Sequence, residues 1–184
     1  MKGVIFTEFM EMVEQGFSPD VLERIIDASN LPSGGVYTTV GTYDHNEIIT
    51  LVSNLSLETG KAVPELLRTF GKHIFRRFVQ NYPVFFDGPY DAISFLERVD
   101  GYIHAEVLKL YPGAELPGID CERPAPGVLK MRYHSSRPFA DFAEGMIMGV
   151  IEHYREDISV ERRDVSGDGR AAEFILTKRG SRNG

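Results

Sequence analysis

The sequence predicts an α+β fold with a helical N-terminal part and a C-terminal part in which helices pack on a small antiparallel sheet. Up to about residue 110 the apolar residues recur at helical spacing, whereas short apolar segments bounded by Pro and Gly follow. With 184 residues, 42% hydrophobic and 26% charged, the chain has an ordinary globular composition. We expect one domain, comprising a helical N-terminal subdomain over residues 1–60 and an α+β subdomain over residues 61–184.

Six helices are predicted from apolar periodicity and from residues that start or stop helices. They cover residues 4–13, 19–28, 45–59, 63–78, 91–110 and 139–151. Ser18 is suited to cap the second helix because Pro19 follows at its first position. Gly60 is a plausible stop for the third helix. Pro112 and Gly113 end the fifth, since proline cannot continue a helix.

Four strands are predicted, over residues 119–122, 128–135, 158–165 and 171–177. The last two are expected to form a hairpin around Gly167-Asp168-Gly169. Antiparallel pairing is the simplest way to join such short strands. The residues from Arg179 to the end are expected to fray.

Charge and composition exclude several classes of partner. The formal net charge is -7, which disfavours nucleic acid because neutralising phosphates requires clustered Lys and Arg. Cys121 is the only cysteine, so no intramolecular disulfide is expected. No apolar run approaches the roughly 20 residues that span a bilayer. We therefore expect a cytoplasmic protein that binds neither nucleic acid nor membrane.

His104 borders the apolar side of the helix predicted over residues 91–110. A histidine in such a place is more often a hydrogen-bonded core residue than a metal ligand. Gly101, one turn away, removes a side chain where a flat ligand could approach the helix. The presence of Gly101 modestly favours a role for His104 as a metal ligand.

Tyr133, Ser135 and Arg137 alternate along a predicted strand, so they are expected to share one face. Two hydroxyls and a guanidinium supply the hydrogen bonds and positive charge that carboxylates or a phosphate require. An equally good interpretation is a polar strand face on which Arg137 pairs with a surface acid. Together with an imidazole and apolar helices, however, this cluster describes a pocket for heme, whose iron takes a histidine and whose propionates need donors.

The spacing of these residues resembles a known family. His104 is followed by Tyr111-Pro112-Gly113-Ala114, by Pro117 and by Tyr133-x-Ser135-x-Arg137. This pattern is similar to that of the heme nitric oxide/oxygen-binding (H-NOX) domains, relatives of the sensor part of soluble guanylate cyclase, and the likeness begins at Met1-Lys2-Gly3. It implies a sensor, not an enzyme, with heme b (iron protoporphyrin IX) between the two subdomains. His104 would be the iron ligand, Pro117 would press on the macrocycle, and Tyr133, Ser135 and Arg137 would hold the propionates.

The resemblance also bears on which gas is bound. Oxygen-binding members place a tyrosine on the helix after the Tyr-x-Ser-x-Arg motif, supported by a tryptophan and an asparagine. Phe142, Phe9 and Ile74 occupy these positions here, and Ile5, Phe78 and Met146 are expected to line the same side of the pocket. Because a hydrogen-bond donor stabilises bound oxygen and nitric oxide binds without one, we expect binding of nitric oxide and carbon monoxide and exclusion of oxygen.

Signalling is expected through movement of the helix that carries His104 and through relaxation of the heme away from Pro117. The receiver would be a separate protein, which in bacterial relatives is commonly a histidine kinase or a cyclic-di-GMP enzyme. Two alternatives stay open. One is a heme-free protein-interaction domain with a core histidine. The other is a heme enzyme of peroxidase type, which would need a distal acid or base.

Overall fold

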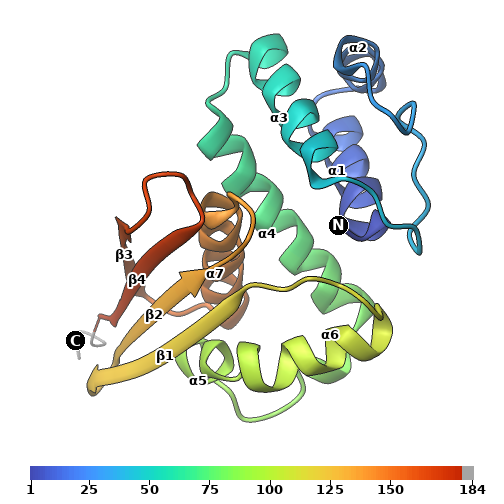
Figure 1. Ribbon diagram of the computed structural model, residues 1–184. Coiled ribbons are helices and arrows are strands. Elements are labelled where there is room, and N and C mark those ends of the chain that lie inside the picture. Colours follow the sequence, from blue (N-terminus) through green and yellow to red (C-terminus); the bar gives the residue numbers. More distant parts are fainter. Residues whose placement is uncertain (180–184) are drawn as a thin grey trace.

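The computed structural model describes residues 1–179, in which helices and a four-stranded antiparallel sheet form an α+β fold (Figure 1). The helices are α1 (Gly3–Gly16), α2 (Pro19–Ser29), α3 (His45–Thr59), α4 (Val63–Asn81), α5 (Ala92–Glu97), α6 (His104–Leu110) and α7 (Ala140–Tyr154). The strands are β1 (Gly118–Ala125), β2 (Val128–His134), β3 (Ile158–Asp164) and β4 (Ala171–Lys178). The predicted fold class is confirmed. Fraying was expected from Arg179 onward, but Arg179 donates its backbone N–H to the carbonyl of Asp157 at 2.8 Å, and residues 180–184 lie outside the described residues.

The helix boundaries follow the residues that marked them in the sequence. The hydroxyl of Ser18 accepts a hydrogen bond from the backbone N–H of Val21 at 3.2 Å, and Pro19 begins α2. Asp44 caps α3 in the same manner. At the end of α3, Gly60 takes the left-handed conformation with φ 71° that glycine adopts readily.

The sheet has the order β1-β2-β4-β3, and all neighbours are antiparallel. The hairpin between β3 and β4 turns around Gly167 and Gly169, which both have positive φ. In Figure 1, α7 lies between the sheet and α4, α5 lies below β1, and α6 lies below the end of α4. No helix within residues 1–179 is long and apolar enough to cross a membrane.

Two hydrophobic clusters form the core, and α4 contributes to both of them. The first joins α1, α2, α3 and one face of α4, with Phe9, Phe70 and Ile74 among its buried residues. The second joins the sheet, α5, α7 and Phe75 of α4. Because α4 runs across the middle of the molecule (Figure 1), residues that follow one another on this helix reach different clusters. The space between the clusters is therefore bordered by α4.

The helix predicted over residues 91–110 is not continuous, which corrects that expectation. A π-helical turn, Val99–Ile103, separates α5 from α6, and both Tyr102 and Ile103 donate their backbone N–H to the carbonyl of Arg98. Gly101 lies in this wide turn, where its low helix propensity opposes a regular helix. The histidine at position 104 thus begins a short helix of its own.

Glycines allow α4 and α7 to cross with their backbones in contact. A Cβ atom at Gly71 would lie 2.2 Å from the carbonyl oxygen of Phe142, and one at Gly145 would lie 2.1 Å from that of Arg68. Neither position has room for a methyl group, since the neighbouring atoms belong to a helix backbone. This close crossing sets where the side chains of α4 and α7 meet.

Replacing Gly145 by Ala should therefore lower the free energy of unfolding by about 1–3 kcal/mol, the usual cost of overpacking. Chemical denaturation of the purified variant and of the unsubstituted protein measures this difference in the free energy of unfolding. Gly16→Ala is the matched control, because a Cβ at this helical glycine has nothing within 4 Å. Equal stability of the two variants would contradict the proposed backbone contact.

Candidate functional site

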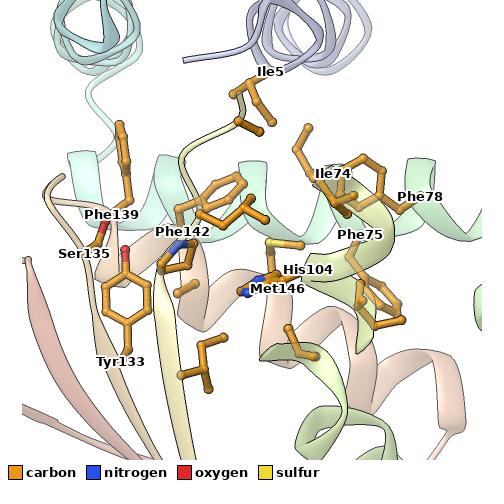
Figure 2. A pocket seen from close by; sticks show the side chains of 18 of the residues that line it. Ile5, Ile74, Phe75, Phe78, His104, Tyr133, Ser135, Phe139, Phe142 and Met146 are labelled. Carbon is orange, nitrogen blue, oxygen red and sulfur yellow. The ribbon is translucent and has the colours of Figure 1, made fainter. Parts of the chain in front are cut away.

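A pocket lies between the two hydrophobic clusters and receives side chains from α1, α4, α6, α7 and β2. Figure 2 shows Tyr133 and Ser135 on one side of the view, Ile74 and Phe78 on the other, and His104 and Met146 between them. The residues predicted from the sequence that line it are His104, Tyr133, Ser135, Arg137, Pro117, Phe142, Ile74, Phe78, Met146 and Ile5. Segments far apart in the sequence thus meet in one cavity.

Phe9 is the one predicted residue that does not line the pocket. Its side chain is fully buried, and its ring packs edge-on against Phe70 with centroids 5.2 Å apart. Phe70 in turn packs against Phe142, also at 5.2 Å. Phe9 therefore supports the pocket wall from behind. The lining residue Phe70 was visible in the helical periodicity of the fourth predicted helix, but no motif singled it out.

His104 is held by a carboxylate one helical turn before it. Its Nδ1 atom lies 3.3 Å from Oδ1 of Asp100, and only 16% of its side chain is exposed. Burial lowers the pKa of His104, and the negative charge of Asp100 opposes this only in part. Because an ionised carboxylate can only accept, Nδ1 carries the hydrogen in the neutral ring, and the lone pair of Nε2 is available as a metal ligand.

Gly101 does not have the role that the sequence suggested. It is exposed, no atom lies within 4 Å of a Cβ built on it, and it does not line the pocket. The π-helical turn changes the direction of side chains between Val99 and His104. The spacing of a regular α-helix therefore placed Gly101 incorrectly next to the pocket.

The polar end of the pocket is built around the end of β2, not along it. Only Tyr133 belongs to the strand, which ends at His134, and Ser135 and Arg137 follow in the connection to α7. The expectation of three residues alternating on one strand was therefore wrong, although all three line the pocket. The Ser135 hydroxyl accepts a hydrogen bond from the backbone N–H of Arg137 at 3.1 Å, which fixes the turn.

Tyr133 and Arg137 supply donors in a largely buried setting. Burial raises the pKa of Tyr133 above its ordinary value, so its hydroxyl stays protonated and can donate. The guanidinium of Arg137 is only 12% exposed and pairs with the carboxylate of Glu115, whose side chain is 69% exposed. A pairing with a surface acid was one of the two interpretations from the sequence. Since Glu115 can turn into solvent, the pairing leaves Arg137 able to bind a carboxylate in the pocket.

The segment after α6 closes the pocket on the side of His104. Tyr111, Ala114, Glu115 and Pro117 all line the cavity. The hydroxyl oxygens of Tyr111 and Tyr82 lie 2.9 Å apart, which joins the end of α6 to the end of α4. The sequence motif includes Tyr111, but nothing in the sequence predicted its partner Tyr82, the residue directly after α4.

These residues fit heme. The walls are apolar, one neutral imidazole faces the cavity, and hydroxyl and guanidinium donors lie together at its polar end. Within residues 1–179 no cluster of three or more His, Cys, Asp or Glu side chains could hold a bare metal ion. A single histidine is what a metal already bound by a macrocycle requires from the protein.

Comparisons with known proteins agree with this site. The family model described as Haem-NO-binding matches residues 2–162. The crystal structure of the Fe(II) unliganded H-NOX protein from K. algicida has 36% sequence identity and a TM-score of 0.94, with 100% of both chains covered. The IWP-051-bound H-NOX from Shewanella woodyi in the Fe(II)CO state has 37% identity and a TM-score of 0.82, covering 100% of this chain and 97% of that one.

A third structure, the S. oneidensis H-NOX protein in the Fe(II)NO ligation state, is only 23% identical and supports the fold alone, with a TM-score of 0.89 over 98% of this chain and 100% of that one. No curated protein is significantly similar to this chain. The family model covers most of the sequence, and the K. algicida and S. woodyi proteins are each more than 30% identical over nearly its full length. The chain therefore belongs to the Haem-NO-binding (H-NOX) family of sensor domains, which are not enzymes and whose cofactor is heme b.

Proposed function

We propose that this protein senses nitric oxide at a ferrous heme held by His104, that it also binds carbon monoxide, and that it excludes oxygen. We further propose that it acts in the cytoplasm on a separate partner protein, which by resemblance to bacterial relatives is a histidine kinase or a cyclic-di-GMP enzyme. When bound, heme would supply the iron that takes the gas, and His104 would hold that iron.

The observation that carries the choice of gas is the wall formed by α1, α4 and α7. Among the described residues, every side chain that these three helices contribute to the pocket is apolar: Val4, Ile5, Leu67, Phe70, Ile74, Phe75, Phe78, Phe142, Ala143, Met146, Ile147 and Val150. Such a wall offers no donor to a bound gas. Oxygen needs one to stabilise its partial negative charge, whereas nitric oxide does not.

Three tyrosines outside this wall have hydroxyls that are engaged elsewhere. Tyr154, at the end of α7, has a buried hydroxyl without a hydrogen-bond partner among the described residues, but it does not line the pocket. The hydroxyl of Tyr37 donates to the carboxylate of Glu47 at 2.9 Å, and that of Tyr43 accepts the backbone N–H of Thr38 at 2.9 Å. Tyr111, which does line the pocket, shares its hydrogen bond with Tyr82. These contacts support the exclusion of oxygen.

The same geometry supports a route for the signal through α6. This helix has only seven residues, follows a π-helical turn and ends at Leu110, before Pro112 and Gly113. A short helix with an irregular turn at each end can shift as a unit when the pull on His104 changes. We propose that this shift moves residues 1–60 relative to residues 61–184, with α4 as the shared element of the two cores.

Absorption spectra of the purified ferrous protein test the choice of gas. Nitric oxide and carbon monoxide should each shift the Soret band, while exposure to air should produce no reversible shift. The experiment starts under nitrogen, and each gas is added to a separate sample. A spectrum that changes in air and returns when oxygen is removed would contradict the proposal.

A further inference from the structure

We infer that Asp100 is a positioning residue for the iron ligand: its carboxylate fixes the ring of His104 and ties the helix of the ligand to the first strand of the sheet. This inference rests on the proposed function, because it assigns His104 to the iron. It adds a residue outside the pocket lining that neither the sequence motif nor the apolar pattern identified.

One oxygen atom of Asp100 makes two contacts. Oδ1 lies 3.3 Å from Nδ1 of His104 and accepts the backbone N–H of Ile119 at 3.2 Å. The first partner lies four residues later on α6, and the second lies nineteen residues later on β1. The carboxylate is therefore located by a strand as well as by its own helix.

The local fold explains this placement. Asp100 lies in the π-helical turn Val99–Ile103, directly before α6. Single π-helical turns often occur at functional sites, where they redirect a side chain that a regular helix would carry elsewhere. Here the turn allows Asp100 to reach both a ring on its own helix and the edge of the sheet.

An ordinary surface ion pair would not explain these contacts. Exposed pairs on a helix contribute little to stability, but here only the carboxylate of Asp100 is half exposed, whereas the side chain of His104 is largely buried and the same carboxylate oxygen also accepts the backbone N–H of Ile119. The contact is then a hydrogen bond that selects which ring nitrogen carries the hydrogen. A carboxylate that accepts from a metal-bound histidine orients the ring and makes its free nitrogen a stronger ligand.

The hydrogen bond between Asp100 and Ile119 can transmit a movement of α6 to the sheet. Ile119 lies two residues after Pro117, and both residues line the pocket. A shift of α6 that moves Asp100 therefore acts on the segment between Pro117 and β1 through a direct hydrogen bond. Histidine, carboxylate and strand form one connected unit.

Two substitutions separate the charge of Asp100 from its hydrogen bonds. Asp100→Ala removes both, and Asp100→Asn keeps an acceptor oxygen without the charge. Asp120→Ala and Asp120→Asn are matched controls, because Asp120 is an exposed acid on β1 and, within the described residues, the hydrogen bond and ion pair of His104 are made with Asp100. The holoprotein of each variant is examined by resonance Raman spectroscopy for the iron-histidine stretch, and heme release to excess apomyoglobin is timed.

We expect Asp100→Ala to lower the stretching frequency and to release heme about tenfold faster, in line with the loss of a group that supports a metal ligand. Asp100→Asn should lie between this variant and the unsubstituted protein, and both Asp120 variants should match the unsubstituted protein. NMR of the His104 ring in the apoprotein should show the hydrogen on Nδ1, and Asp100→Ala should lose this preference. If that variant does not fold, Asp100→Asn is nearly isosteric and decides the question alone.

A purely structural role predicts a different result. Asp100→Ala would then lower the melting temperature but leave the iron-histidine frequency and the ring tautomer unchanged, and this outcome would overturn the inference. If the unsubstituted protein itself shows no iron-histidine stretch, both this inference and the assignment of His104 to the iron are wrong. The two failures are thus distinguishable.

Discussion

His104→Gly is expected to detach the heme iron from α6 and to produce the largest loss of cofactor among single substitutions in the pocket. His104 is the only imidazole among the described residues that line the pocket, and no cluster of other metal ligands is present in this part of the chain. Removing a residue that merely supports a metal ligand already costs roughly ten- to a hundredfold in affinity. Removing the ligand itself should exceed that range, as measured by transfer of heme to apomyoglobin.

Added imidazole gives the experiment a second result. The glycine variant leaves a space where the ring was, and free imidazole can occupy it and bind the iron without a covalent link to α6. The Soret band should then return toward that of the unsubstituted protein. Any response that depends on a pull from the iron on α6, including regulation of a partner, should not return. His45→Gly is the control, since His45 lies at the start of α3 and does not line the pocket.

Two outcomes would contradict this expectation. If His104→Gly retained the spectrum and the heme affinity of the unsubstituted protein, the iron would have another ligand. If the His104→Gly variant, with free imidazole bound to its heme iron, still passed a nitric oxide signal to a partner, movement of α6 would not carry that signal. The first outcome concerns the site, and the second concerns the mechanism.

Regular elements could be predicted because their signals are local. Ser18, Pro19 and Gly60 mark helix boundaries through their own hydrogen bonds and backbone conformations, and the structure places the start of α2 and the end of α3 where these residues predict them. The antiparallel sheet followed from short strands separated by Pro and Gly. In each case the cause lies within a few residues of the effect.

Features that depend on distant contacts were not predictable in the same way. The π-helical turn before His104 has no distinct periodicity of its own, and its carboxylate is located by Ile119 on a strand. Phe9 lies behind Phe70, because the rings of Phe9, Phe70 and Phe142 pack one behind another. The spacing of apolar residues along a helix does not show such packing. His104, Pro117, Tyr133, Ser135 and Arg137 of the motif all line the pocket, whereas Phe9, which is not part of the motif, does not.

The end of β2 illustrates the same limit. Alternation predicts a shared face for Tyr133, Ser135 and Arg137 only while the chain stays extended. Beyond His134 the backbone turns, and Ser135 is held by a hydrogen bond from its N–H to the carbonyl of Arg170 at 2.9 Å. The three side chains still reach one pocket because this turn replaces the strand geometry.

Phe142→Tyr should introduce oxygen binding into the pocket, which we propose excludes oxygen in the unsubstituted protein. Phe142 lines the pocket from α7, so a hydroxyl at the end of its ring would be the first donor on the wall formed by α1, α4 and α7. A hydrogen bond to a charged acceptor contributes about 1.5–3 kcal/mol. This corresponds to an increase in oxygen affinity of about 10- to 150-fold, measured by titration of the ferrous variant with oxygen.

Phe142→Leu is the matched control, because it changes the size of the side chain without adding a donor. It should bind no more oxygen than the unsubstituted protein. Nitric oxide affinity should change little in either variant, since nitric oxide does not depend on the donor. Equal oxygen binding by the Phe142→Tyr and Phe142→Leu variants would show that space in the pocket, and not a missing hydrogen bond, excludes oxygen.

The surroundings of Phe142 indicate that Phe142→Tyr alone should give less than the full gain in oxygen affinity. Its ring neighbours are Phe70 and Phe139, and Ile74 on α4 is apolar as well, so a new hydroxyl has no partner that orients it. Leaving a buried hydroxyl unpaired costs about 1–3 kcal/mol in the absence of oxygen. Adding Ile74→Asn gives the hydroxyl a partner from α4, so the double variant should bind oxygen more tightly than Phe142→Tyr alone. If Ile74→Asn instead changed oxygen affinity equally with and without Phe142→Tyr, the two positions would act independently, and the donor would not need to be oriented from α4.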